Sequence, residues 1–213
     1  MSTARLTAAT MAGRVVGVAS RVARRGTGAS IRGKVMLKLD PSALSKLLAG
    51  KRIAVVSGTN GKTTTTHFLA AALRESLPAG TNRLVHNADG ANLHHGLASA
   101  LSQHPDADIA ILESDERVVG DVIRLGRPEV LVLLNFSRDQ LDRHHEIKSL
   151  GRSWRTALAY AGEDGPMVVA NADDPAVTWA ALAAEHQEWV AVGTEWRADS
   201  SVCPACGSRC TTS

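Results

Sequence analysis

Aromatic residues are scarce in this sequence and make up only 3% of its 213 residues. Aromatic rings are the surfaces on which bases of single-stranded nucleic acid stack, so we expect no nucleic-acid partner. Long apolar runs are missing too, and no stretch approaches the roughly 18 residues that a membrane-spanning helix needs. A membrane-spanning protein is therefore excluded.

Acidic residues are absent from the first 39 positions, which hold eight basic residues; the first carboxylate is Asp40. On a helix, Arg14, Arg21 and Arg25 fall on one face, and apolar residues gather opposite them: Met11, Val15, Val18, Ala19 and Val22. Three interpretations are open for this basic helical segment. It is a helix packed by its apolar side with its arginines in water, a helix bound to an anionic membrane surface, or a transit peptide.

The apolar run at residues 15–19 is too short for a secretion signal, which favours the cytoplasm, with contact at the inner face of the membrane as one option. Glycines in residues 26–33 predict a flexible connector. Asp40 and Pro41 then predict the start of a short helix that runs to about Ala49.

Short apolar runs alternate with longer amphipathic stretches from residue 51 onward. The apolar runs predict strands at residues 53–57, 84–87, 108–112, 130–135, 167–171 and 189–193. The stretches between them predict helices at residues 63–76, 93–103, 116–125, 147–161 and 175–185. This alternation is typical of an α/β fold, a parallel sheet with helices on both faces. Ligands of such sheets bind at the carboxyl ends of the strands.

A glycine-rich segment, Ser57-Gly-Thr-Asn-Gly-Lys-Thr-Thr-Thr-Thr66, lies between the first strand and the next helix. Gly58 and Gly61 allow a tight turn whose N–H groups point at phosphate oxygens, and the helix start adds its positive dipole end. Lys62 is predicted to hold the β- and γ-phosphates, and the Thr63 hydroxyl to bind Mg²⁺. We therefore expect ATP to be bound by seven residues: Gly58, Thr59, Asn60, Gly61, Lys62, Thr63 and Thr64.

Acidic and amide residues follow several predicted strands. Glu113 stands at the end of one strand, where it is either a Mg²⁺ ligand or an acid at a helix start. Asp139 and Asp142 lie in a charged loop after the next strand, and we favour them over the neighbouring histidines as functional residues. Asn171 ends another strand and is expected to contact the nucleotide, whereas Asp173 or Asp174 is available to cap the following helix.

These motifs stand in one order: Gly58-Thr-Asn-Gly-Lys-Thr63, Glu113, Asn135-x-x-x-Asp139-x-x-Asp142 and Asn171-Ala-Asp-Asp174. In this order they resemble the central ATPase domain of Mur ligases, over about residues 51 to 193. Four further stretches resemble the MurT-like branch, the ligase subunits of lipid II isoglutaminyl synthases; they are residues 34–41, 87–93, 138–143 and 203–207. The short region before the phosphate loop also fits this branch, because it is too small for the UDP-sugar-binding domain of other Mur ligases.

The resemblance implies ATP-dependent amidation of the D-glutamate α-carboxyl in the lipid II stem peptide, through an acyl phosphate. Ammonia would come from a GatD-like glutamine amidotransferase subunit, and the catalytic residues would be Lys62, Glu113 and Asp139. Gln140 departs from the pattern, since amino-acid-adding Mur ligases carry a metal-binding histidine there. Trp154 and Arg155 stand where those enzymes carry a lysine with a carbamate, so a second metal site of that type is not expected.

Cysteine is rare, with three residues in all. Cys203 and Cys206 have the CxxC spacing that presents two thiolates to one metal, and Cys210 is a third candidate zinc ligand; a free or redox-active thiol pair is the alternative. Since no second CxxC follows, we expect the chain to stop inside a zinc ribbon. The expected parts are a basic helical segment (1–50), a Mur-ligase-like ATP-binding domain (51–198) and an incomplete zinc-ribbon insertion (199–213).

Two other functions remain open from sequence. One is an amino-acid-adding Mur or folylpolyglutamate-type ligase. The other is a non-catalytic nucleotide-binding subunit whose basic N-terminus docks on a membrane or on nucleic acid. In either ligase reading we expect this chain alone to be inactive, because the resemblance implies a further carboxy-terminal domain.

Overall fold

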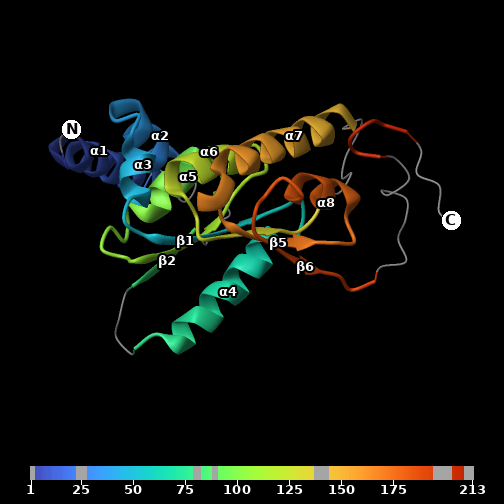
Figure 1. Cartoon of the computed structure of the whole chain (residues 1–213). Coiled ribbons are helices and arrows are strands. Elements are labelled where there is room, and N and C mark those ends of the chain that lie inside the picture. The colour runs from blue at the N-terminus through green and yellow to red at the C-terminus, as the bar shows by residue number, and fades with distance from the viewer. Residues whose placement is uncertain are drawn as a thin grey trace. The chain divides into compact units, whose positions relative to one another are not determined.

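Three helices come first, and strands then alternate with helices along the rest of the chain (Figure 1). The computed structural model describes residues 3–22, 28–78, 83–87, 91–136, 144–193 and 203–208. Six strands form one sheet in the order β2-β3-β1-β4-β5-β6. The pairings of β2 with β3, β1 with β4, β4 with β5 and β5 with β6 are parallel. The predicted α/β fold with a parallel sheet is therefore confirmed, whereas a zinc ribbon is not seen in the described residues.

The chain divides into two compact units. The first unit comprises Met1–Ile53 and Thr63–Ser114. It holds α1 (Thr3–Val22), α2 (Ala29–Leu39), α3 (Ala43–Leu48), nearly all of α4 (Lys62–Ser76), β2 (Leu84–His86), α5 (His94–Leu101) and β3 (Ile109–Glu113). The second unit comprises Ala54–Lys62 and Asp115–Ser213. It holds most of β1 (Arg52–Ser57), then α6 (Val119–Gly126), β4 (Val130–Leu133), α7 (His144–Ala161), η1 (Gly162–Asp164), β5 (Met167–Asn171), α8 (Pro175–Ala181) and β6 (Gln187–Val190).

The core of the second unit lies between its strands and the long helix α7. The inward residues of β4 and β5 are aliphatic and buried: Leu131, Leu133, Val168 and Ala170. Trp154 of α7 is fully buried, and its ring lies 4.3 Å from that of Phe136, centroid to centroid. Its indole Nε1 donates to the Glu116 carbonyl at 2.8 Å, so α7 is fixed both by apolar contact and by a hydrogen bond.

Helix α2 corrects the expected connector at residues 26–33, because the chain is helical from Ala29. Gly28, with φ of 75°, directly precedes it. Gly33 lies inside the helix, and a methyl group there would come within 1.7 Å of the His95 carbonyl oxygen. Gly28 and Gly33 thus reflect close approaches, of Gly28 to Gly17 in α1 and of Gly33 to His95 in α5, and residues 29–33 are not a flexible connector.

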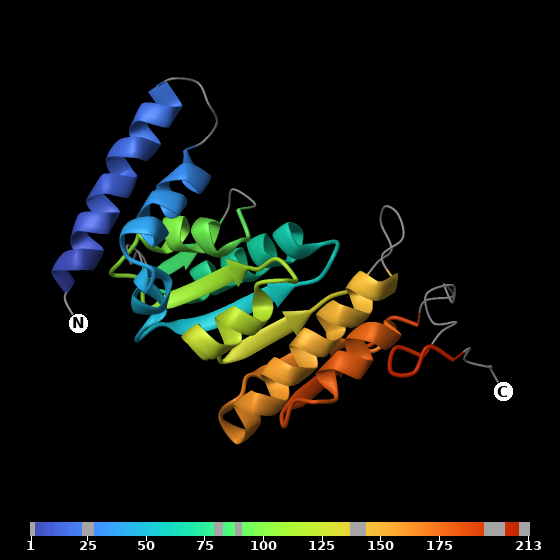
Figure 2. The same cartoon turned by 90° about the horizontal axis from the view of Figure 1, so that it is seen from above.

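Helix α1 packs on α2 through its small residues, Ala9, Gly13 and Gly17 (Figure 2). A methyl group on Gly13 would lie 2.7 Å from the Met36 Cγ atom, so only glycine permits this approach. The apolar residues that we expected as one possible packing face are exposed instead: Met11, Val15, Val18 and Val22. The interpretation that α1 buries this apolar side is therefore wrong.

Candidate nucleotide-binding site

The glycine-rich loop has the backbone that its sequence predicts. Gly58 has a φ of 141° and Gly61 a φ of 83°, values that side-chain-bearing residues rarely adopt. A methyl group on Gly58 would also lie 2.9 Å from the backbone nitrogen of Asn135. Glycine is therefore required at position 58 for two reasons: its positive φ, and the close approach of the loop to the residue that follows β4.

Asn135 holds the first half of this loop. Its carbonyl accepts from the Thr59 N–H at 2.8 Å, and its side-chain Oδ1 accepts from the Asn60 N–H at 2.9 Å. The Asn135 amide donates in return to the Asn60 carbonyl at 3.1 Å. Two N–H groups expected to face phosphate are thus bound to protein here, and Asn135 has a positioning role that our site prediction missed.

Lys62 begins α4 and lies against the loop that precedes it. Its ammonium donates to the Gly58 carbonyl, and to the Thr59 carbonyl at 3.0 Å. It also lies 3.5 Å from the Glu116 Oε1 atom, and both side chains are largely buried, with 12% and 15% exposed. Burial strengthens such a pair, so Glu116 balances the lysine charge and keeps the ammonium at the loop.

Thr63 and Glu113, the two predicted Mg²⁺ ligands, are in direct contact. The Thr63 hydroxyl donates to Glu113 Oε2 at 2.8 Å, and Asn92 Nδ2 donates to Oε1 at 3.1 Å. Glu113 is only 3% exposed. A carboxylate that is buried in this way needs hydrogen-bond donors or a cation, and it has two donors here.

Asn87 fixes the backbone of Glu113. Its Oδ1 accepts from the Glu113 N–H at 2.7 Å and its Nδ2 donates to the Glu113 carbonyl at 2.8 Å. The same Nδ2 lies 3.1 Å from the Ala91 carbonyl. Because both ends of one amide are used on Glu113, Asn87 sets the position from which the carboxylate projects.

This donor set fits Mg²⁺. A carboxylate oxygen and a threonine hydroxyl are hard oxygen ligands, which Mg²⁺ prefers, and it commonly binds few protein ligands beside phosphate oxygens. The alternative interpretation of Glu113, as an acid in the first turn of a helix, does not fit, because α6 begins only at Val119. Asp115 instead pairs with Arg117, whose hydrogen bonds lower the pKa of the Asp115 carboxyl.

The residues after β5 connect strand ends to α8. Asn171 Nδ2 donates to the Leu134 carbonyl at 2.8 Å, and its Oδ1 accepts from the Asp173 N–H at 2.9 Å. Asp174 caps α8 by accepting from the Ala176 N–H at 2.9 Å, as expected of one of the two aspartates. Nucleotide contact by Asn171 stays a prediction.

Asp139, Asp142 and Cys210 lie outside the residues that the structure describes. Thr64 is described and exposed on α4. Of the three predicted zinc ligands, the structure describes Cys203 and Cys206. They share one turn, in which the Gly207 N–H donates to the Cys203 carbonyl at 2.8 Å and Gly207 has a φ of 80°.

Hydrogen bonds from Ser208 lower the pKa of the Cys206 thiol to about 7. The turn thus suits two zinc ligands. No group of three or more metal-ligating side chains occurs within the described ranges, so a complete zinc site is not seen there.

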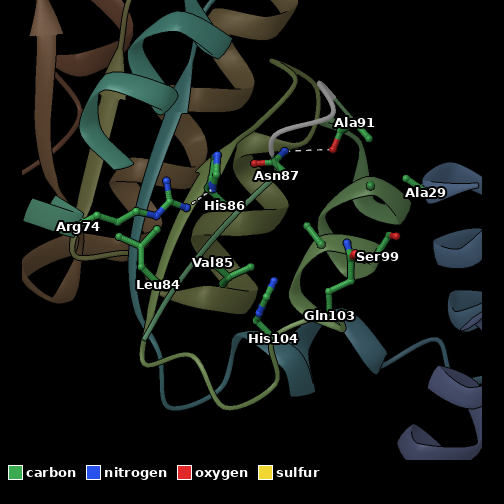
Figure 3. A pocket seen from close by; sticks show the side chains of 12 residues that line it. Ala29, Arg74, Leu84, Val85, His86, Asn87, Ala91, Ser99, Gln103 and His104 are labelled. Atoms are coloured by element: carbon green, nitrogen blue, oxygen red, sulfur yellow. Dashed lines mark hydrogen bonds between the residues drawn. The ribbon is translucent and has the colours of Figure 1, made fainter. Parts of the chain in front are cut away.

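A polar hollow of about 250 Å³ lies beside β2 and α5 in the first unit (Figure 3). Arg74 Nη2 lies 2.8 Å from His86 Nδ1. Burial, followed by the nearby Arg74 charge, lowers the pKa of His86, so its neutral ring accepts this bond. Asn87 lines the hollow and also binds the backbone of Glu113, which itself does not line it.

A glycine-rich loop between a parallel strand and a helix, followed by lysine and threonine, is the pattern of α/β proteins that bind phosphate at such a loop. Residues 56–202 match the model of the Mur ligase middle domain. The chain belongs to the Mur ligase family, whose members are ATP-dependent ligases.

Curated relatives agree with this assignment. The MurT subunit of lipid II isoglutaminyl synthase from Staphylococcus aureus (strain N315) is 32% identical over 196 residues, which are 87% of this chain and 43% of that protein. The MurT subunit of Streptococcus pneumoniae is 36% identical over 130 residues, or 59% of this chain and 28% of that protein. A UDP-N-acetylmuramate–L-alanine ligase from Mycobacteroides abscessus is 32% identical over 155 residues, or 70% and 28%. The chain thus spans less than half the length of these relatives.

Solved structures share the fold. MurF from Acinetobacter baumannii superposes with a TM-score of 0.54 at 17% identity, covering 75% of this chain and 35% of that one. A UDP-N-acetylmuramoyl-L-alanyl-D-glutamate–2,6-diaminopimelate ligase gives 0.51 at 19% identity, covering 80% and 37%. At these identities the likeness shows the fold of the Mur ligase central domain alone.

Proposed function

We propose that this chain is the ATP-binding part of a lipid II isoglutaminyl synthase, an enzyme of peptidoglycan biosynthesis. The single observation that carries the proposal is the 32% identity to a MurT subunit over 87% of the chain. The reaction would convert the D-glutamate α-carboxyl of the lipid II stem peptide to the amide of D-isoglutamine.

The proposed chemistry uses ATP to make that carboxyl reactive. The carboxylate attacks the γ-phosphorus of ATP, the bond to ADP breaks, and an acyl phosphate forms. Ammonia then displaces phosphate and gives the amide. Lys62 would bind the phosphates and stabilise the charge that moves between them, since an ammonium makes strong charge-assisted contacts with phosphate.

Thr63 and Glu113 would hold Mg²⁺, which would neutralise phosphate charge when bound. Asn87 and Asn92 would keep Glu113 in place, and Asn135 would keep the loop open to the nucleotide. Asp139 is proposed as a further catalytic residue on the strength of the resemblance alone. The contacts of Thr63, Asn92, Asn87 and Asn135 and the chemistry of the donor set support the roles other than that of Asp139.

Ammonia is proposed to come from a glutamine amidotransferase subunit of the GatD type. The MurT relatives support this, because their names describe a glutamine-hydrolysing synthase made of subunits. We place the enzyme in the cytoplasm, where ATP and the precursor's peptide are both accessible, at the inner face of the membrane. Within the described ranges, no helix is long and apolar enough to cross a bilayer.

We also propose the division into a basic helical segment (1–50), an ATP-binding domain (51–198) and an insertion (199–213) that holds zinc through Cys203, Cys206 and Cys210. The chain alone is proposed to be inactive as a ligase. It spans less than half of its relatives, and Mur-type catalysis is expected to need a further domain over the nucleotide.

An amino-acid-adding ligase is the second candidate, because the UDP-N-acetylmuramate–L-alanine ligase relative is also 32% identical. One experiment separates the two functions. The longer protein that contains this chain is mixed with its glutaminase partner, lipid II, glutamine and ATP, and the product is identified by mass spectrometry. Parallel reactions receive UDP-N-acetylmuramate with L-alanine instead.

Amidated lipid II that forms only with ATP and glutamine would support the proposal. A product extended by an amino acid would support the second candidate. Absence of both products, with ATP still bound, would favour a non-catalytic nucleotide-binding subunit. The Lys62→Ala variant is the control for background amidation.

A further inference from the structure

The outward side of α1 is a continuous apolar stripe. Its members are Met11, Val15, Val18 and Val22, which are 62%, 69%, 50% and 80% exposed. Their spacing of four, three and four residues places them on one face of the helix. A side chain this apolar is ordinarily buried, and a run of four on one face marks a surface that another phase or molecule covers.

The opposite face of α1 already makes the contact with α2, through Ala9, Gly13 and Gly17 (Figure 2). Turning the helix to bury the stripe would bring valine side chains against α2. A methyl group on Gly17 already falls within 3.2 Å of the Arg32 side chain, and one on Gly13 within 2.9 Å of the Arg32 carbonyl. The apolar stripe therefore faces away from α2, because only glycine fits at the contact between α1 and α2.

The charged residues in the first 39 positions of the sequence are all basic. Arg5 Nε donates to the Leu39 carbonyl at 2.9 Å, and Arg14 Nη2 to the Ser102 carbonyl at 3.1 Å. Each binds a neutral oxygen, which leaves its positive charge in place. The sequence adds six more basic residues before the first acid, Asp40.

We propose that α1 is a membrane-surface helix that lies in the plane of an anionic bilayer, with Met11, Val15, Val18 and Val22 inserted at the boundary of the acyl chains. An apolar face on a helix whose charged residues are all arginines is typical of interfacial helices, in which apolar burial and attraction to anionic lipid add together. Charge complementarity selects this occupant over a second copy of the chain, whose own α1 would carry the same positive charge. The proposal does not rest on the ligase assignment.

Vesicle co-sedimentation of this chain tests the proposal. Vesicles of phosphatidylglycerol with phosphatidylcholine are compared with vesicles of phosphatidylcholine alone. The test variant is Met11→Gln, Val15→Gln and Val18→Gln together, because glutamine is polar and a good helix former. The matched control replaces three exposed apolar residues of the second unit by glutamine instead: Leu182→Gln, Val190→Gln and Val192→Gln.

The wild type and the control should sediment with anionic vesicles, and the α1 variant should partition at least about tenfold less. Binding should weaken in about 1 M salt, where charges are screened beyond about 3 Å. Far-UV circular dichroism confirms that each variant is folded. Binding that is equal for wild type and α1 variant, or absent for the wild type, overturns the proposal. The proposal is also overturned if analytical ultracentrifugation shows that the wild type and the control are dimers and the α1 variant is not.

Discussion

The Thr63 hydroxyl donates a 2.8 Å hydrogen bond to the Glu113 carboxylate, although the two residues are 50 positions apart in the chain. This bond joins the first turn of α4 to the end of β3, inside one compact unit. Two oxygen ligands suited to Mg²⁺ are thereby held together. The lysine that precedes Thr63 is held by Glu116, a separate acid, so the proposed phosphate and metal roles involve different carboxylates.

Replacement of Lys62 by alanine should weaken ATP binding by about tenfold to a hundredfold. A charge-assisted hydrogen bond contributes about 1.5–3 kcal/mol, and each 1.4 kcal/mol is about tenfold in affinity. Isothermal titration calorimetry with ATP and Mg²⁺ measures the change. Lys34→Ala is the matched control, because it removes the same charge from the exposed surface of α2. Unchanged affinity in Lys62→Ala would contradict the phosphate-binding role of the loop.

Replacement of Glu113 by glutamine should preserve most ATP affinity but slow lipid II amidation by at least about a hundredfold in the complete, partner-bound enzyme. Binding draws on several loop contacts, whereas charge neutralisation during phosphoryl transfer needs a correctly held Mg²⁺. The measurement pairs ATP titration with the amidation rate at saturating Mg²⁺. Asp115→Asn, two residues away and paired with exposed Arg117, should stay within a few-fold of wild type. A similarly small effect in Glu113→Gln would show that Glu113 is not a metal ligand.

Replacement of Asp40 by asparagine should destabilise the protein by about 1–3 kcal/mol at pH 7. The Asp40 carboxylate accepts from Lys46 Nζ at 2.6 Å and from the Ser42 hydroxyl at 2.7 Å, and the Lys46 hydrogen bond lowers its pKa. A lowered pKa stabilises the folded state above the ordinary value near 4, and this contribution is lost as the pH falls further.

Urea unfolding of wild type and Asp40→Asn at several pH values tests the sign. The difference between them should be largest at pH 5–7 and should shrink below about pH 4. Asp121→Asn, which breaks a surface pair with Arg124, should change stability by no more than about 1 kcal/mol. A difference between wild type and Asp40→Asn that is constant with pH would rule out the proposed ionic contribution.

Zinc should bind weakly to this chain, because Cys203, Cys206 and Cys210 leave one position of a tetrahedral site to water or to another ligand. Zinc binds thiolates, so its affinity should rise as the pH passes through about 7, the pKa of Cys206. Metal analysis after dialysis against a mild chelator measures retention, with Cys203→Ser as the control. One tightly held zinc per chain would mean that a further residue completes the site.

The strands and the phosphate loop were predictable because their patterns are local. The run from Met167 to Asn171 is a strand with the predicted bounds. Strand β1 begins at Arg52, one residue before its predicted start, and ends at Ser57 as predicted. Helix α2 was not predictable, since Gly28 and Gly33 favour a connector unless their close contacts with α1 and α5 are known. Strand β6 begins two residues earlier than its apolar run, because pairing with β5 from Gln187 to Val190 sets its register.

The candidate site was predictable in its charged residues and less so in its amides. Lys62, Thr63 and Glu113 follow from strand ends and loop spacing, and the structure places Thr63 beside Glu113. Asn87 and Asn135 act on backbone groups far away in sequence, which no spacing rule reveals. Their position could have indicated this role, because Asn87 directly follows β2 and Asn135 lies two residues after the end of β4.

Asn87, Asn135 and Asn171 each join the end of one strand to a neighbouring segment, and each does so with an uncharged group. Aspartate has nearly the same shape, but an ionised carboxylate only accepts hydrogen bonds. It could not donate to the carbonyls of Glu113, Asn60 and Leu134 as these three amides do. The amides therefore connect the strand ends through a donor and an acceptor on one side chain, and they add no further carboxylate beside Glu113.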